Sequence, residues 1–99
     1  MDASRLWATL DGQAQQHIEA TFARLKLTAK ERTAVLKAAA ANLRYQAQRG
    51  GSGQGYKGQT GDDVISAVSD YRTRRWSQLM SLAVEVTAVA KKNGAAKPV

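Results

Sequence analysis

Apolar residues recur at helical spacing in the first quarter of the chain. Between residues 3 and 26 they lie three or four positions apart, at Leu6, Leu10, Ala14, Ile18, Phe22 and Leu25. A helix would gather these side chains on one face. Gly12 interrupts the stretch, and a continuous helix through it would cost about 1 kcal/mol relative to alanine. Because Asp11 is a residue type that caps helix N-termini, we predict a break there and a second helix after it.

The next stretch carries a clear helix start. Thr28 and Glu31 have the spacing of a capping box, in which the hydroxyl accepts from the backbone at 31 and the carboxylate accepts from the backbone at 28. We predict a helix from this point to about Gln48. Its apolar side would collect Val35, Leu36, Ala39, Leu43 and Ala47.

Residues 49–61 contain six glycines in thirteen positions, which predicts a mobile connection without regular structure. Beyond it, one stripe continues at helical spacing through Val64, Val68, Tyr71, Arg75, Leu79, Leu82, Val86 and Val89. We therefore predict one long helix that begins at Thr60 or Asp62 and extends to Lys92. Asn93 and Gly94 are typical of a helix end, and residues 94–99 are predicted to form a disordered tail.

These patterns predict one all-α domain over residues 1–93. The expected architecture is a small bundle of three to four helices, with a long C-terminal helix and a glycine-rich loop before it. Composition favours the helical class, because 43% of the residues are hydrophobic, many of them alanine, while aromatic residues make up 6%. Ninety-nine residues allow one modest core.

The chain is strongly basic, with fifteen Lys and Arg against eight Asp and Glu and a formal charge of +7. Such an excess favours polyanionic partners. The absence of cysteine excludes disulfides, thiolate zinc sites and cysteine nucleophiles. No stretch approaches the roughly 18 consecutive apolar residues of a membrane span, and the start lacks a basic segment followed by an apolar run. We therefore expect a cytoplasmic protein without a membrane partner.

The positive charge is concentrated in the middle of the chain, where residues 28–49 hold five cations and one acid. Lys30, Lys37 and Arg44 are seven residues apart and would form a basic ridge along one side of the second long helix. Such a ridge suits the phosphates of a nucleic-acid strand, whereas an ordinary solvated helix face is the alternative. Arg49 and Lys57, in the glycine-rich segment, would extend the predicted nucleic-acid-binding surface.

Two further arginines are predicted to need an anion. Arg75 falls on the apolar stripe of the last helix, and Arg72 lies about 60° from it. The anion would be either an external phosphate or an internal carboxylate of Glu19, Glu31 or Asp11. We include Arg72 and Arg75 in the predicted surface.

Three neighbours of these arginines are expected to have structural roles. Arg74 is predicted to form a surface ion pair with Asp70 or Glu85. Tyr71 and Trp76 are expected in the core, with stacking on bases as the alternative.

The sequence does not indicate catalysis. His17 is the only histidine, and Glu19 would face another side of the same helix, so neither a metal cluster nor a nucleophile and base pair is formed. The adjacent acids Asp62 and Asp63 suit the positive end of a helix dipole. We predict no enzymatic activity, no metal and no cofactor.

The sequence therefore predicts a non-catalytic protein that binds the phosphate backbone of RNA or DNA, largely independently of base sequence. It would act as a small subunit of a larger nucleoprotein assembly, in contact with other subunits or with its own copies. In size, helical class and charge it resembles the small helical subunits of CRISPR effector complexes and the accessory proteins of plasmid mobilisation, without a diagnostic motif of either.

Two alternatives stay open. The first is a helical protein-interaction module, associated with a phage, a plasmid or secretion, whose arginines pair with an acidic partner. The second is a helix-turn-helix within residues 15–49, with Lys30, Arg32 and Thr33 facing the major groove.

Overall fold

Helices dominate the computed structural model, which describes the backbone of residues 3–52 and 61–94 and the side chains of residues 3–45 and 61–94. The helices are α1 (Ala3–Thr9), α2 (Gly12–Arg24), α3 (Ala29–Ser52), α4 (Gly61–Ser66) and α5 (Arg74–Lys92). These residues contain no strand. The predicted all-α class is confirmed, and the described residues form five helices where three to four were expected.

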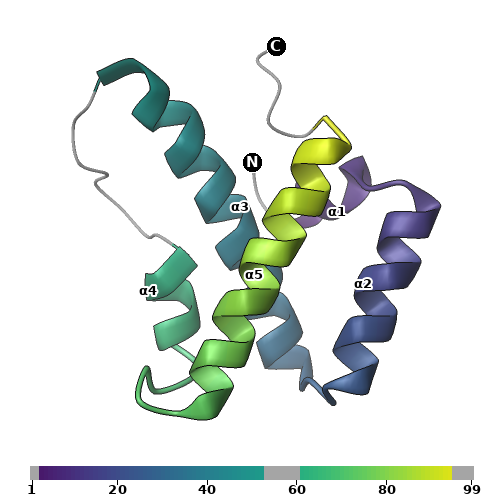
Figure 1. Cartoon of the computed structure of the whole chain (residues 1–99), viewed down its shortest axis with the longest axis vertical. Coiled ribbons are helices and arrows are strands. Elements are labelled where there is room, and N and C mark those ends of the chain that lie inside the picture. The colour runs from purple at the N-terminus through teal and green to yellow at the C-terminus, as the bar shows by residue number, and fades with distance from the viewer. Residues whose placement is uncertain (1–2, 53–60, 95–99) are drawn as a thin grey trace.

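The central feature of the fold is the crossing of α3 and α5 (Figure 1). Helix α4 packs against both of these helices, and α1 packs against α3. Helix α2 lies on the side opposite α4 and runs antiparallel to α5 (Figure 1). The chain therefore places α4 and α2 as the two flanks of one central helix pair.

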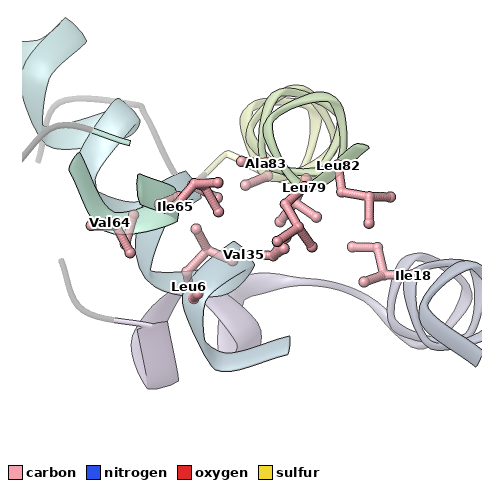
Figure 2. Close-up of a cluster of buried hydrophobic side chains, with 14 of the residues drawn as sticks. Leu6, Ile18, Val35, Val64, Ile65, Leu79, Leu82 and Ala83 are labelled. Atoms are coloured by element: carbon pink, nitrogen blue, oxygen red, sulfur yellow. The ribbon is translucent and has the colours of Figure 1, made fainter. Parts of the chain in front are cut away.

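All five helices contribute side chains to a single core (Figure 2). The largest fully buried side chains are Phe22, Leu6, Ile65, Leu79, Val35 and Val86. Burying each of them contributes about 1.5–3 kcal/mol relative to exposure. Ile18 of α2 faces Leu82 of α5 in this cluster, which is how the outer helix α2 joins the core (Figure 2).

The predicted N-terminal caps of the second and third helices, at Asp11 and Thr28, are confirmed. Asp11 caps α2, and its carboxylate accepts from the backbone N–H of Ala14 at 2.8 Å. At α3 the backbone N–H of Glu31 donates to Thr28 Oγ1 at 3.1 Å, and the backbone N–H of Thr28 donates to Glu31 Oε1 at 2.9 Å. Both motifs join residues only three positions apart, so local sequence was enough to identify them.

The predicted long C-terminal helix is wrong, because residues 67–73 break it into α4 and α5. Helix α4 ends where the backbone N–H groups of Val68 and Ser69 both donate to the carbonyl of Ile65, at 3.0 Å. A new helix start follows, in which Thr73 Oγ1 accepts from the backbone N–H of Trp76 at 3.1 Å. As a result α3, with 24 residues, is longer than α5, with 19.

The predicted glycine-rich loop is shorter than expected. Helix α3 continues through Ser52, and Gly61 is already the first residue of α4. A Cβ atom at Gly61 would lie 2.9 Å from Asn42 Cγ, so this glycine allows α4 to lie close against α3. The predicted mobility of residues 53–60 and the predicted tail at 95–99 lie outside the described residues.

Candidate nucleic-acid interface

Arg75 connects the start of α5 to the start of α3. Its Nε donates to Glu31 Oε2 at 2.7 Å, and its Nη2 donates to Glu31 Oε1 at 3.2 Å. The guanidinium also donates to the backbone carbonyls of Leu25, at 3.2 Å, and Lys26, at 3.3 Å. The anion of Arg75 is therefore the internal carboxylate of Glu31, which was one of the two alternatives for this residue. The guanidinium is engaged within the chain, so Arg75 is not a candidate for contact with nucleic acid.

Glu31 is the acceptor at the centre of these contacts, and its side chain is 14% exposed. Its hydrogen bond from Arg75, followed by the one from the Thr28 backbone, lowers the pKa of the Glu31 carboxyl below its usual 4.5. The carboxylate is therefore ionised at neutral pH. It serves both the cap of α3 and the ion pair with Arg75.

The turn between α2 and α3 is closed by the Schellman hydrogen-bond pattern. The backbone N–H of Lys26 donates to Ala23 O at 3.1 Å, and that of Leu27 donates to Phe22 O at 3.2 Å. Lys26 occupies the left-handed position of this motif, with φ of 54°, where glycine is the usual residue. The turn thus holds an exposed lysine in an unfavourable backbone conformation.

The contacts of Arg75 gather cationic side chains at one end of the molecule. The exposed cations that flank Arg75 and the α2–α3 turn are Arg24, Lys26, Lys30, Arg72 and Arg74. Within the part of the chain that the structure describes, no member of this set lies within 4.0 Å of a carboxylate oxygen. We call this set the basic end.

The break between α4 and α5 places Tyr71 and Arg72 on the surface of the basic end. Arg72 Nε donates to Tyr71 Oη at 3.1 Å, and the guanidinium carbon lies 5.4 Å from the centre of the tyrosine ring. Tyr71 is 62% exposed, so its predicted core position is wrong. Trp76 is half-buried against the core, and its Nε1 donates to Ser66 Oγ at 3.1 Å.

The predicted basic ridge on α3 is present only in part. Lys30 and Lys37 are both exposed and line the same groove between α3 and α4. Arg44 is half-buried and has an interaction within the structure. The side chains of Arg49 and Lys57 lie outside the described residues.

Sequence reasoning missed three members of the basic end. Arg74 does not pair with Asp70 or Glu85, because Glu85 Oε1 accepts from His17 Nε2 at 3.1 Å and Asp70 Oδ1 accepts from the backbone N–H of Arg72 at 2.9 Å. Arg24 and Lys26 were missed because they lie on a charge-balanced part of the sequence. The sequence feature that could have identified them is their position at the end of one helix, just before the Thr28 cap of the next.

A groove of about 430 Å³ separates α4 from the first half of α3. Its lining is mainly apolar, with Lys30 and Lys37 as its only charged residues: Ala29, Lys30, Thr33, Ala34, Lys37, Val64, Ala67 and Val68. We call it the α3–α4 groove. Such a surface suits apolar side chains flanked by acids.

A second groove, of about 400 Å³, lies between α2 and α5. Its lining is mainly polar, formed by Thr21, Arg24, Leu25, Arg74, Ser77, Gln78, Ser81, Leu82 and Glu85. We call it the α2–α5 groove. It includes two arginines of the basic end.

The described residues contain no group of three or more His, Cys, Asp or Glu side chains placed to hold a metal ion. Among the described helices, none combines the length and apolar character that crossing a bilayer requires. Comparison of the chain with protein-family models, with curated proteins and with solved structures finds no match.

Proposed function

We propose that this is a non-catalytic protein that binds the phosphate backbone of RNA or DNA, largely independently of base sequence, as a small subunit of a nucleoprotein assembly. The basic end is the observation that carries this proposal. Its cations are exposed and have no carboxylate partner in the described part of the chain. Each phosphate that such a cation neutralises releases counterions, which favours binding without base recognition.

Arg75 supports this function by positioning rather than by contact. Its guanidinium donates to Glu31, Leu25 and Lys26 of this chain. These hydrogen bonds fix the α2–α3 turn against the start of α5, so the cations on both segments keep a constant arrangement. This arrangement favours binding of the phosphate backbone, because the cationic side chains lose less conformational entropy when the strand binds.

The surroundings of the basic end add two features. The exposed ring of Tyr71, beside Arg72, offers a face on which an unpaired base can stack. Lys37 lies seven residues after Lys30, about 10.5 Å along the helix axis, and extends the cationic surface up α3. Both features add contact surface for a strand beside the basic end.

The test measures the affinity of the protein for a fluorescein-labelled single strand and duplex as salt is raised. In the double variant Lys26→Gln, Lys30→Gln, the slope of log K against log salt should become shallower by about 1.8 for the duplex and about 1.4 for the single strand. The matched control is Lys91→Gln, Lys92→Gln, which removes the same charge from the far end of α5. Equal slopes for the two double variants would contradict a footprint at the basic end.

A second candidate function is a protein-interaction module, and the α3–α4 groove favours it. An apolar floor with Lys30 and Lys37 on one wall is complementary to an amphipathic helix that carries acidic residues beside its apolar stripe. The apolar floor formed by Val64, Ala67 and Val68 cannot make favourable contacts with the charged phosphate backbone, so it is better explained by a protein partner.

This second candidate is tested with a synthetic amphipathic helix that carries glutamates beside a leucine stripe. If it is right, the peptide should shift the methyl resonances of Val64, Ala67 and Val68, and Ala67→Trp should abolish the Val64 and Val68 shifts by filling the groove. Ala67→Trp leaves the charge unchanged and should leave strand binding at the basic end intact. A peptide that shifts none of these resonances would remove the second candidate.

A further inference from the structure

The α2–α5 groove joins guanidinium groups from two different helices. Arg24 comes from the last turn of α2, and Arg74 is the first residue of α5. Both line the groove, and neither has a carboxylate partner among the described residues. Arginine presents a planar fork of N–H donors that matches two oxygens of a phosphate, so two such forks across one groove suit a single phosphate group.

The α5 wall of the groove supplies neutral donors. Ser77 and Ser81 lie one helical turn apart, and both are exposed and line the groove. Gln78 lies between them, and its Oε1 accepts from Arg75 Nη1 at 3.2 Å. Because arginine can only donate, this contact fixes the amide orientation and leaves the Gln78 amide nitrogen as the donor for a ligand.

The one acid of the groove is engaged elsewhere. Glu85 Oε1 accepts from His17 Nε2 at 3.1 Å, one turn beyond Ser81 and away from the arginines. The negative charge is therefore at the far end of the groove. An anion would lie at the end that Arg24 and Arg74 form.

The width of the groove is fixed by three polar links between α2 and α5. At one end the backbone N–H of Asp11 donates to Asn93 Oδ1 at 2.9 Å, and in the middle lies the His17–Glu85 contact. At the other end Arg75 donates to the carbonyls of Leu25 and Lys26. A groove held in this way is pre-organised, which lowers the entropic cost of binding.

We propose that the α2–α5 groove binds one phosphate group, held by Arg24 and Arg74 and by the Ser77 hydroxyl. The inference rests on the proposed function, in which this group is a phosphodiester of the bound strand. It deepens that function by assigning one fixed phosphate site within an otherwise diffuse basic surface. The strand would then bind in a defined register relative to α5.

The decisive variant keeps the charge and changes the shape of the donors. Arg24→Lys, Arg74→Lys should weaken binding of a labelled oligothymidine by about fivefold while the salt slope stays unchanged, because lysine lacks the bidentate fork. Arg32→Lys is the matched control, because Arg32 lies outside the basic end and pairs with Glu19, and it should change affinity by less than about twofold. Circular dichroism checks that each variant is folded. Equal effects of the groove variant and the control would overturn the proposal.

A direct probe separates this proposal from the proposed function. Inorganic phosphate and dimethyl phosphate, added at constant ionic strength, should shift the Arg24 and Arg74 Nε–H resonances and leave that of Arg72 in place. Shifts without any binding of the oligothymidine would reject the nucleic-acid function and retain the phosphate site. Strand binding without these shifts would reject the site alone. Binding to phosphatidylglycerol vesicles but not to the strand would assign the phosphate to a lipid headgroup and overturn the phosphodiester.

Discussion

The two flanks of the central helix pair form grooves of similar volume and opposite chemistry. The α3–α4 groove encloses about 430 Å³ and is mainly apolar, while the α2–α5 groove encloses about 400 Å³ and is mainly polar. Helix α4 approaches closely because Gly61 has no Cβ, whereas α2 is joined to α5 by polar links at both ends and in the middle. The lining residues decide the chemistry: alanines and valines form most of the α3–α4 groove, whereas hydroxyl, amide and guanidinium groups form most of the α2–α5 groove.

The largest expected effect comes from breaking the contacts of Arg75, which join the start of α5 to the start of α3 and to the α2–α3 turn. Arg75→Ala leaves the Glu31 carboxylate without its partner and should lower the free energy of unfolding by about 2 kcal/mol. This is below the about 3–5 kcal/mol for fully buried pairs, because the Arg75 side chain is 33% exposed. Urea denaturation measures the change. Strand affinity should fall as well, because the basic end loses its fixed arrangement.

The control for this variant is Arg32→Ala. Arg32 Nη2 lies 3.8 Å from Glu19 Oε1, and both side chains are about half exposed, at 47% and 57%. Removing this pair should cost less than about 1 kcal/mol. If Arg32→Ala and Arg75→Ala destabilise the protein equally, the special role of the Arg75 contacts is refuted.

The α3–α4 side is tested by adding one methyl group. Gly61→Ala places a Cβ 2.9 Å from Asn42 Cγ, so the Asn42 side chain or α4 has to shift, at an expected cost of about 1 kcal/mol in unfolding free energy. Gly12→Ala is the matched control, since nothing lies within 4 Å of its Cβ, and its stability should be unchanged or slightly higher. Phosphate-induced shifts in the α2–α5 groove should survive in both variants; their loss in Gly61→Ala would show that the two flanks are coupled.

Acid should weaken the ion pair that joins Glu31 at the start of α3 to Arg75 at the start of α5. The folded-state pKa of Glu31 is below 4.5, so its stabilising contribution is fully present above pH 4.5 and is lost as the pH falls through the lowered value. Wild type and Glu31→Gln should therefore differ in unfolding free energy at pH 6 and converge as the pH is lowered below 4. A difference that stays constant between these pH values would contradict the assigned ion pair.

The smallest predicted effect separates backbone conformation from charge at Lys26. Lys26→Gly removes the penalty of a left-handed lysine and should raise the unfolding free energy by about 1 kcal/mol. Lys26→Gln keeps that penalty and loses the same charge. Both should weaken strand binding by about threefold at low salt, if the lysine contacts phosphate. Unequal losses of affinity would indicate that turn conformation, and not charge, governs binding.

Local sequence predicted the features that depend on neighbouring residues. The helical class, the Asp11 cap and the Thr28–Glu31 capping box all follow from spacing within one or two turns. The break between α4 and α5 was missed because Val68 continues the apolar spacing across it, whereas in the structure Thr73 caps a new helix. Apolar periodicity alone predicts a continuous helix at this point. In the structure, backbone hydrogen bonds to the carbonyls of Ile65 and Asp70 form the break instead.

The candidate site was less predictable than the fold. Arg75 was correctly expected to need an anion, but its partner Glu31 lies 44 residues away, and a choice among distant carboxylates requires the packed structure. Lys30 and Arg72 were identified, whereas Arg24 and Arg74 acquire a common environment only because α2 folds back along α5. The grouping of a site from different helices is a property of the tertiary fold.

The three links that join α2 to α5 also determine how the molecule opens. Helix α2 has 13 residues, a length that is marginal for an isolated helix in water. Because Asn93, Glu85 and Arg75 hold its start, middle and end, unwinding from either terminus of α2 requires breaking a contact with α5. Amide protons of α2 should therefore exchange with solvent together with those of α5, as one cooperative unit rather than by fraying.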